Sequence, residues 1–333
     1  MRLRQLGSGP LRRYNDARVI LSPMRIVDLR QLHSRSLEPL FQEETQRWRE
    51  ELQWDYQPSI DLVRKFIDSR ALGGYAAIEN GEPIGYGFYV LEDYKGLIGG
   101  LFVSSQHSQA PTTQRLLIEM LSALQATPRL ERIEAQLMPF GTELDPAFLS
   151  QHFHLHTRQF MLLRLAEAKL KAEPLSAGLR IEPWTDRAFE SAARLIQLAY
   201  ANHVDGRIND QYCSEAGSLR FLRNIVLLPG CGQFLPAASF LVRPATGDAL
   251  IGMILTSTVA DKVGHTTQVC VMPGHHGRGI GRHLMEHSIE TLGRRNYESL
   301  SLTVTSVNTR AVELYEHLGF RTVKTFAAGV WQA

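Results

Sequence analysis

The chain has 333 residues, 44% of them hydrophobic, and a formal net charge of +2. This length allows two domains, and the near-neutral charge gives no reason to expect a nucleic acid or a charged membrane surface as partner. Three scattered cysteines, no apolar run long enough to cross a bilayer and no secretory leader favour a reduced, cytoplasmic setting over a disulfide framework or a membrane.

The first half of the chain predicts one α/β unit. Residues 1–17 are basic and rich in turn formers, and we expect them to be a mobile or loosely docked arm. A short strand, Val19–Pro23, and an amphipathic helix come next. Further on, the sequence predicts a glycine-interrupted strand at Leu97–Val103, a helix at Gln114–Leu124 and a closing strand at Phe160–Leu165.

Residues 167–178 are charged and contain Pro174 and Gly178, so they predict a linker. The second half, residues 179–333, opens as the first does. A short strand that ends at proline, Leu179–Pro183, precedes an amphipathic helix.

The most informative stretch is Gln268–Leu284, QVCVMPGHHGRGIGRHL. It predicts a short strand at Val269–Val271, a stop at Pro273, a glycine-rich turn and a helix. The glycines let successive N–H groups point into one hollow, where the helix dipole and two arginines add positive charge. This pattern predicts a diphosphate cradle, but its spacing is neither that of a P-loop nor that of the dinucleotide fingerprint. The cradle residues are Gly277, Arg278, Gly279, Ile280, Gly281 and Arg282.

A second pattern follows the strand-like run Leu300–Val304. Apolar side chains recur at i, i+3, i+4 and i+7, which predicts a helix with one buried stripe. Asn308 suits the N-cap of this helix, and Gly319 suits the left-handed position after its end. The stripe consists of Ala311, Leu314, Tyr315 and Leu318.

These two stretches resemble motifs A and B of the GCN5-related N-acetyltransferases, the GNAT superfamily. Motif A is commonly written Gln/Arg-x-x-Gly-x-Gly/Ala and corresponds to His276–Gly281, with His276 in the Gln/Arg position. Motif B corresponds to Asn308, Ala311, Tyr315 and Gly319-Phe320. The resemblance implies an α/β (α+β) fold, in which a mixed, mostly antiparallel sheet splays after the motif A strand and is flanked by helices.

The two halves align as copies of one unit, as in the tandem acetyltransferases, including those that resemble mycothiol synthase. One offset sets Val103 under Val271, and an offset shorter by a single position sets Phe148 under Tyr315. We therefore predict GNAT-like domains at 18–166 and 179–333. The first copy lacks counterparts of the cradle glycines, of the Asn308 amide and of the Tyr315 hydroxyl. We therefore predict that it does not bind the acyl-CoA cofactor. The replacements are Gln109, Pro111 and Thr113 for the glycines, Gly141 for Asn308 and Phe148 for Tyr315.

By the same resemblance, the second copy would move an acetyl group from acetyl-CoA to a primary amine by direct attack. Backbone groups of Val269 and Val271 would pair with the pantetheine arm, and the N–H of Val271 would polarise the thioester carbonyl. Tyr315 would protonate the leaving CoA thiolate. The acceptor would be a small-molecule or peptide amine. The other cofactor-binding residues would be His276, Gly277, Arg278, Gly279, Ile280, Gly281, Arg282 and Asn308.

The general base stays open in the sequence, because the motif A strand carries no carboxylate. Water relayed by backbone groups is one alternative. The loop after the first helix of the second copy is also where we expect the acceptor to be selected, with Tyr200 and Tyr212. The candidate bases are His265, His203, Asp205 and Asp210.

Two further chemistries are disfavoured. Cys270 could be proposed as a nucleophile, but strand alternation turns it away from Val269 and Val271. We expect no metal site, because HLMEH is not the His-Glu-x-x-His pattern and no third ligand is evident. The histidines considered were His283 and His287 on one helix, and the alternating His152, His154 and His156.

Other functions remain as alternatives. A different acyl donor, or aminoacyl-tRNA, would use the same fold, although the CoA-type loop and the near-neutral charge argue against the tRNA version. The absence of a carboxylate on the motif A strand favours a non-catalytic acyl-CoA sensor or scaffold. The presence of Tyr315 and Asn308 disfavours it.

Overall fold

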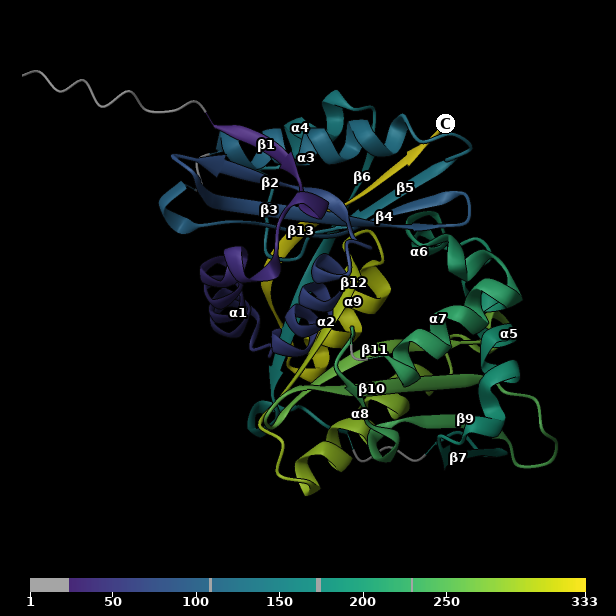
Figure 1. Cartoon of the computed structure of the whole chain (residues 1–333). Coiled ribbons are helices and arrows are strands. Elements are labelled where there is room, and N and C mark those ends of the chain that lie inside the picture. The colour runs from purple at the N-terminus through teal and green to yellow at the C-terminus, as the bar shows by residue number, and fades with distance from the viewer. Residues whose placement is uncertain (1–23, 108–109, 172–174, 229) are drawn as a thin grey trace, which may run out of the picture.

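The structure is a computed structural model that describes residues 24–107, 110–171, 175–228 and 230–333. In this part of the chain thirteen strands form one sheet, with helices on both of its faces (Figure 1). The strand order is β1-β2-β3-β4-β5-β13-β6-β12-β11-β10-β9-β7, and β8 pairs with β10. The predicted arm, the predicted strand Val19–Pro23, Gln109 and Pro174 lie outside the described residues.

The N-terminal copy, predicted at 18–166, begins with an antiparallel run from β1 to β4. A crossover helix, α3, then leads to β5, which is parallel to β4. Its strands are β1 (Arg25–Asp28), β2 (Gly73–Glu79), β3 (Glu82–Glu92), β4 (Lys95–Val103), β5 (Arg132–Gln136) and β6 (His154–Arg164). Its helices are α1 (Glu38–Leu52), α2 (Gln57–Asp68), α3 (Ala110–Gln125) and α4 (Asp145–Ser150).

The C-terminal copy, predicted at 179–333, repeats this order, with α8 as the crossover helix between two parallel strands, β11 and β12. Its strands are β7 (Leu179–Pro183), β8 (Gln233–Phe234), β9 (Phe240–Pro244), β10 (Gly252–Ala260), β11 (Val263–Val271), β12 (Ser299–Thr305) and β13 (Arg321–Gln332). Its helices are α5 (Phe189–Tyr200), α6 (Val204–Ile208), α7 (Glu215–Leu227), α8 (Ile280–Arg294) and α9 (Thr309–Leu318).

The two copies correspond strand by strand at the offset that the sequence suggested. Strand β4 spans Lys95–Val103 and β11 spans Val263–Val271, so the offset between Val103 and Val271 also relates the first residues of the two strands. Each strand also contains one extra residue in its pairing with the preceding strand, Gly99 in β4 and Thr267 in β11. A β-bulge at equivalent positions indicates one unit present twice, because a bulge changes the twist and direction of its strand locally.

The copies exchange their last strands at the centre of the sheet. Strand β6, the last of the N-terminal copy, lies between β13 and β12 of the C-terminal copy. Strand β13 in turn lies between β5 and β6 of the N-terminal copy. The predicted bounds 18–166 and 179–333 therefore divide the chain by sequence. In space, each copy is completed by a strand of the other.

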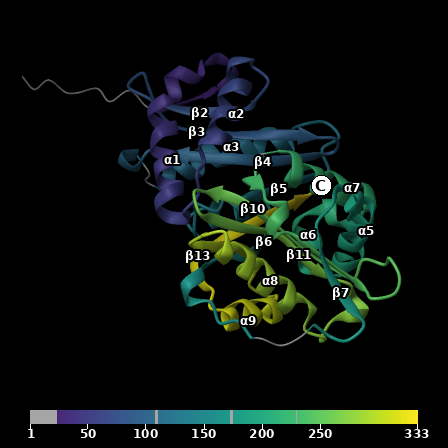
Figure 2. The same ribbon diagram turned by 90° about the horizontal axis from the view of Figure 1, so that it is seen from below.

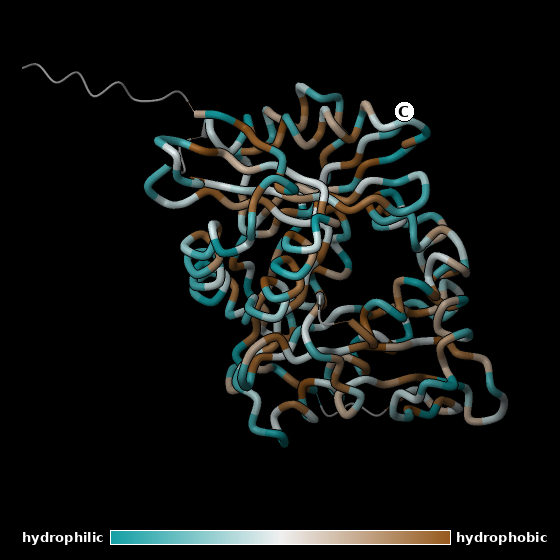
Figure 3. Tube along the Cα trace, in the orientation of Figure 1, coloured by the Kyte–Doolittle hydropathy of each residue, from teal (hydrophilic) through white to brown (hydrophobic). Residues whose placement is uncertain are grey.

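Apolar residues concentrate along the strands (Figure 3), and the helices enclose separate cores on the two faces. In the C-terminal copy, α8 and α9 pack on one face and α5 and α7 on the other (Figure 2). The core under α1 and α2 includes Phe160, Val259 and Phe326, so it is shared between the copies. Among the described residues, no helix has both the length and the apolar character that a membrane span requires.

Candidate active site

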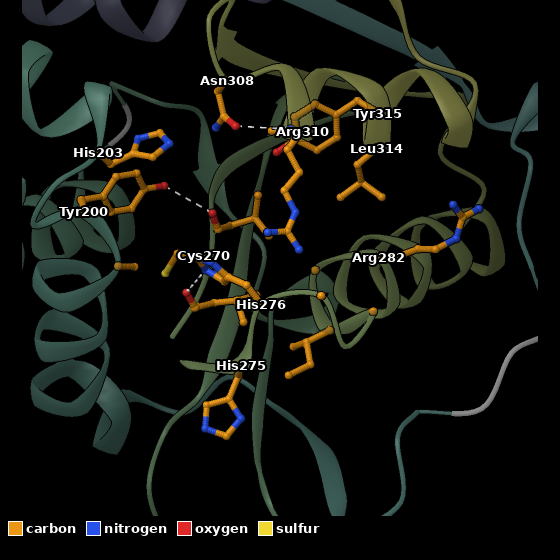
Figure 4. A pocket seen from close by; sticks show the side chains of 18 residues that line it. Tyr200, His203, Cys270, His275, His276, Arg282, Asn308, Arg310, Leu314 and Tyr315 are labelled. Carbon is orange, nitrogen blue, oxygen red and sulfur yellow. Dashed lines mark hydrogen bonds between the residues drawn. The ribbon is translucent and has the colours of Figure 1, made fainter. Parts of the chain in front are cut away.

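The sheet opens beside β11, as the motifs predicted. Strands β11 and β12 pair in parallel only from Val263–Thr266 to Ser299–Leu302, and beyond that point they separate. A pocket of about 450 Å³ lies at this opening, between the end of β11, the start of α8, α9 and the end of α5 (Figure 4). A parallel pair that parts in this way exposes backbone groups that a bound molecule can pair with.

The backbone of β11 faces the opening at Val269 and Val271. The carbonyl oxygen of Val269 accepts a hydrogen bond from the Tyr200 hydroxyl at 3.3 Å, and Nε2 of His276 lies 2.9 Å from the carbonyl oxygen of Val271. On the other side, the N–H of Met272 bonds to Ile251 of the neighbouring segment. Because both polar groups of one strand residue point the same way, the N–H groups of Val269 and Val271 also face the pocket.

The glycine-rich turn forms an N–H cradle at the start of α8. Gly277 and Gly279 have left-handed φ angles of +79° and +76°, which side chains rarely adopt. The first intrahelical donor is the N–H of His283, which bonds to Gly279. Among the described backbone hydrogen bonds, none is donated by residues 277–282, so six successive N–H groups are left for an anion.

The arginines of this region differ in role. Arg282 bonds to Glu286 at 2.8 Å, and Arg278 lies outside the pocket with its guanidinium 3.1 Å from Nδ1 of His275. Arg310, which the sequence analysis missed, points from α9 into the pocket and lies over Gly277 (Figure 4). Among the described residues no carboxylate pairs with Arg310. The sequence signal for Arg310 is its position two residues after Asn308, at the end of the helix that faces the cradle.

Helix α9 brings the two motif B side chains to the same pocket. The Oδ1 of Asn308 caps the helix by accepting from the N–H of Ala311 at 3.3 Å, which leaves its amide N–H₂ free to donate. Tyr315 is 7% exposed, and burial raises the pKa of its phenol, so it stays protonated at neutral pH. The helix ends at Gly319, whose φ is +103°, as the sequence predicted.

The loop after α5 forms the wall opposite Tyr315. His203 lines the pocket. Its Nδ1 accepts a hydrogen bond from the backbone N–H of Asp205 at 3.2 Å and lies 3.5 Å from the carboxylate of Asp205. Asp205 in turn accepts from the hydroxyl of Thr305 at the end of β12. The rings of Tyr200 and Tyr212 pack beside them, tilted by 31° with centroids 4.6 Å apart. The predicted acceptor loop therefore lies at the pocket.

Two of the candidate bases lie elsewhere. His265 is buried, its Nδ1 lies 2.8 Å from the Ser301 hydroxyl, and its ring packs near that of Trp54. Burial lowers the pKa of His265 to about 3, so it does not take up a proton at neutral pH. Asp210 is bound to Lys95 and Tyr94 of the N-terminal copy. Neither side chain lines the pocket. Of the four candidates only His203 lines it, and Asp205 lies against His203.

The structure also shows the surroundings of the candidate nucleophile and of the candidate metal-binding histidines. Burial raises the pKa of the Cys270 thiol, which packs toward α5, so it is a poor nucleophile. His287 packs on Phe240, and His283 lies 3.9 Å from Glu286. The described residues contain no group of three His, Cys, Asp or Glu side chains placed to hold a metal ion.

At the equivalent place in the N-terminal copy the cradle is replaced by a different surface. The carboxylate of Glu43 accepts a hydrogen bond from the N–H of Ser105, two residues after β4, at 2.6 Å. The adjoining cavity is lined by Glu43, Glu51 and Glu143 together with Thr113. The offset that sets Val103 under Val271 also sets Ser105 under Pro273, so the Glu43 carboxylate lies at the start of the corresponding turn. Arg47 also lines this cavity, but the three carboxylates outnumber it, which disfavours a diphosphate.

Comparison with known proteins identifies the family of this site. Residues 213–320 match the acetyltransferase (GNAT) family. The chain is 30% identical over 163 residues to the mycothiol acetyltransferase of Beutenbergia cavernae, which covers 48% of this chain and 51% of that protein. It is 37% identical over 73 residues to the ribosomal protein bS18-alanine N-acetyltransferase of Salmonella typhimurium, covering 22% of this chain and 49% of that one. The chain thus spans about half the length of these relatives.

Solved structures share the fold over most of the chain. A GCN5-related N-acetyltransferase from Sphaerobacter thermophilus matches with a TM-score of 0.64 and 14% identity, over 93% of this chain and 95% of that one. A tandem GNAT protein from the clavulanic acid biosynthesis pathway matches with a TM-score of 0.59 and 13% identity, over 93% and 98%. Residues 213–320 are therefore a GNAT acetyltransferase domain, and the solved structures show that the chain shares the tandem GNAT fold over most of its length.

Proposed function

We propose that this protein is an N-acetyltransferase that transfers an acetyl group from acetyl-CoA to a primary amine, and that only its C-terminal copy is active. The observation that carries the proposal is one pocket that joins the free N–H groups of residues 277–282, the open edge of β11 and the buried hydroxyl of Tyr315. No second place in the described chain combines these three features.

The groups that line the pocket follow the same order as the parts of acetyl-CoA that they would bind. The cradle and Arg310 would hold the diphosphate, and the free amide of Asn308 would donate to the cofactor. The pantetheine arm would pair with Val269 and Val271 along the open edge. The contacts from Tyr200 and His276 to these two carbonyls would then be exchanged for contacts from the arm.

The reaction follows from the groups at the far end of the pocket. The amine nitrogen attacks the thioester carbonyl, whose developing negative charge is stabilised by the N–H of Val271. The C–S bond breaks, and the CoA thiolate takes a proton from Tyr315. Burial keeps the Tyr315 phenol protonated and available as a donor, and the proton that it gives to the thiolate is replaced by the proton that the amine loses on attack.

We propose His203 as the group that receives the proton from the attacking amine, after which the carboxylate of Asp205, 3.5 Å from Nδ1, would stabilise the imidazolium. His203 is the one candidate base that lines the pocket, and its ring is held by Asp205 and by the edge of Tyr200, with ring centroids 5.3 Å apart. The acceptor would enter between this loop and Tyr315. One relative is named for mycothiol and the other for an alanine of ribosomal protein bS18, so we propose a small-molecule or peptide amine.

The N-terminal copy would brace this site. Lys95 of β4 bonds to Asp210 in the acceptor loop and lies 3.6 Å from Glu134, and the side chain of Lys95 is 4% exposed. Arg132 of β5 donates to the carbonyl oxygen of Arg207 in the same loop. A buried charge network of this kind holds a loop in one position. Three free cysteines fit a reduced, cytoplasmic setting for the enzyme.

The test is release of CoA thiol from acetyl-CoA across a panel of amines, with Tyr315→Phe beside the wild type. Turnover on one class of amine, lowered in the variant, supports the proposal and identifies the acceptor class. Calorimetric binding of acetyl-CoA without turnover on any amine would favour the non-catalytic sensor. A lack of binding would contradict the assignment of the cradle.

A further inference from the structure

A separate apolar pocket lies in the N-terminal copy, between helices α1 and α2 and strands β3 and β4. Its volume is about 310 Å³, within the range of pockets that bind small molecules. None of its lining residues lines the acetyl-CoA pocket. The proposed reaction therefore makes no use of it.

One carboxyl group projects from α1 into the wall of this pocket. Glu44 is 3% exposed and, among the described lining residues, is the only one with a charged side chain. One of its oxygens accepts from the hydroxyl of Tyr86, and no hydrogen bond to the other is found among the described residues. The indole Nε1 of Trp48 is buried next to this carboxyl and has no hydrogen-bond partner of normal geometry. Two polar side chains are thus buried here with incomplete partners.

The rest of the pocket is aromatic and aliphatic. Trp48 and Tyr56 form a stacked pair with ring centroids 4.2 Å apart, and Phe88 forms part of the floor. At the mouth, Leu62, Phe66 and Val90 are 42%, 42% and 46% exposed. Large apolar side chains that leave this much surface in water at the edge of a pocket commonly mark a ligand site.

The charge and shape select one class of ligand. A carboxylic or phosphoric acid would face Glu44 with no cation in the lining to balance it. A neutral apolar molecule would shut the carboxyl away from water with Tyr86 as its hydrogen-bond donor and no cation beside it, which is costly in a buried site. An ammonium group can pair with the carboxylate and lie against aromatic rings at the same time, because the faces of those rings attract cations.

We propose that this pocket binds a small organic cation, in which an ammonium group pairs with Glu44 and an aryl or alkyl body contacts the aromatic wall. This site is distinct from the acceptor site of the proposed acetyl transfer. It places a ligand in the copy that has no cofactor cradle, and thus gives that copy a binding role of its own.

The test is calorimetric titration of the full chain at pH 8, above the pKa of about 7 to which burial raises Glu44, and without acetyl-CoA. The ligands are phenethylammonium and two analogues of nearly the same shape, neutral 2-phenylethanol and anionic 3-phenylpropionate. We expect the cation to bind about tenfold or more tightly than either analogue. In Glu44→Gln, which can still accept from Tyr86, this preference should be lost. Equal binding of the alcohol, or an unchanged affinity in Glu44→Gln, would overturn the proposal.

Two variants locate the bound cation and guard against misfolding. Glu43→Gln changes the neighbouring carboxylate on the same helix, which faces the other cavity, and should bind phenethylammonium as the wild type does. Val90→Trp fills the mouth from an exposed position and should weaken binding even if Glu44→Gln does not fold. Undiminished binding in Val90→Trp would place the cation elsewhere and refute the site.

Discussion

Substitution of one cradle glycine by alanine tests the conformation of the cofactor loop. Gly279 has a φ of +76°, and a Cβ atom there would meet nothing nearer than His283 at 3.7 Å. The alanine is therefore strained by its backbone and not by a clash, at a cost of about 1–2 kcal/mol. If the loop keeps its shape, this cost lowers the stability of the protein. If the loop relaxes, the cost reduces acetyl-CoA affinity roughly 5- to 30-fold.

Gly274 is the matched control, because it lies in the same turn without a left-handed φ and does not line the pocket. A Cβ atom there would meet nothing within 4 Å. Gly274→Ala should therefore keep acetyl-CoA affinity within about twofold. Thermal unfolding and calorimetric titration measure the two effects. A Gly279→Ala variant unchanged in both, or an equal loss in Gly274→Ala, would refute this reasoning.

Three further outcomes are expected. Tyr315→Phe should lower kcat by about 10²-fold in a CoA-release assay while leaving acetyl-CoA affinity unchanged, and an unchanged kcat would remove Tyr315 from the reaction. Lys95→Met removes the buried cation of Asp210, which keeps only the Tyr94 hydroxyl, while Glu134 keeps Arg132. This variant should cost about 3 kcal/mol and raise the KM for the amine. Arg220→Met, which breaks an exposed ion pair between the same copies, should cost under about 1 kcal/mol. Burial raises the pKa of Glu44 from 4.5 to about 7, against the opposing effects of Tyr86, Trp48 and Arg47, so the native state holds a proton that the unfolded chain releases. The free energy of unfolding should thus fall by an amount on the order of 2 kcal/mol as pH rises from about 5 to 7.5. Glu44→Gln should not show this fall. Denaturant unfolding at both pH values measures the difference.

The sequence was sufficient to predict the backbone of the glycine-rich turn and of helix α9, because local rules determine both. Glycines at 277 and 279 are needed for left-handed φ angles, and the Asn308 cap and Gly319 stop define a helix by local rules. The offset that sets Val103 under Val271 also relates the whole of β4 to β11. These signals are local, so they can be recognised without knowledge of the tertiary structure.

The acceptor side could not be predicted in the same way, because it depends on contacts between distant segments. His265 on the motif A strand and His203 in the loop after α5 were both candidate bases. His265 is buried against Trp54, whereas His203 lines the pocket. The exchange of β6 and β13 is also invisible in the sequence, since the two strands are related copies and alternation predicts a strand without naming its neighbours. Arg310 was missed because the motif does not specify that position.

The exchanged strands have a consequence for synthesis on the ribosome. Strand β6 ends at Arg164, but β13, the strand that belongs between β5 and β6, ends only at Gln332, so the whole C-terminal copy must be made before it is available. At common translation speeds this is a delay of roughly 10–30 s. During this time β5 lacks a partner on one edge and β6 on both, because β12 and β13 belong to the C-terminal copy, and these edges could pair with another nascent chain. We expect that the N-terminal copy completes its fold only after the C-terminal copy has been made, so that the order of folding runs against the order of translation.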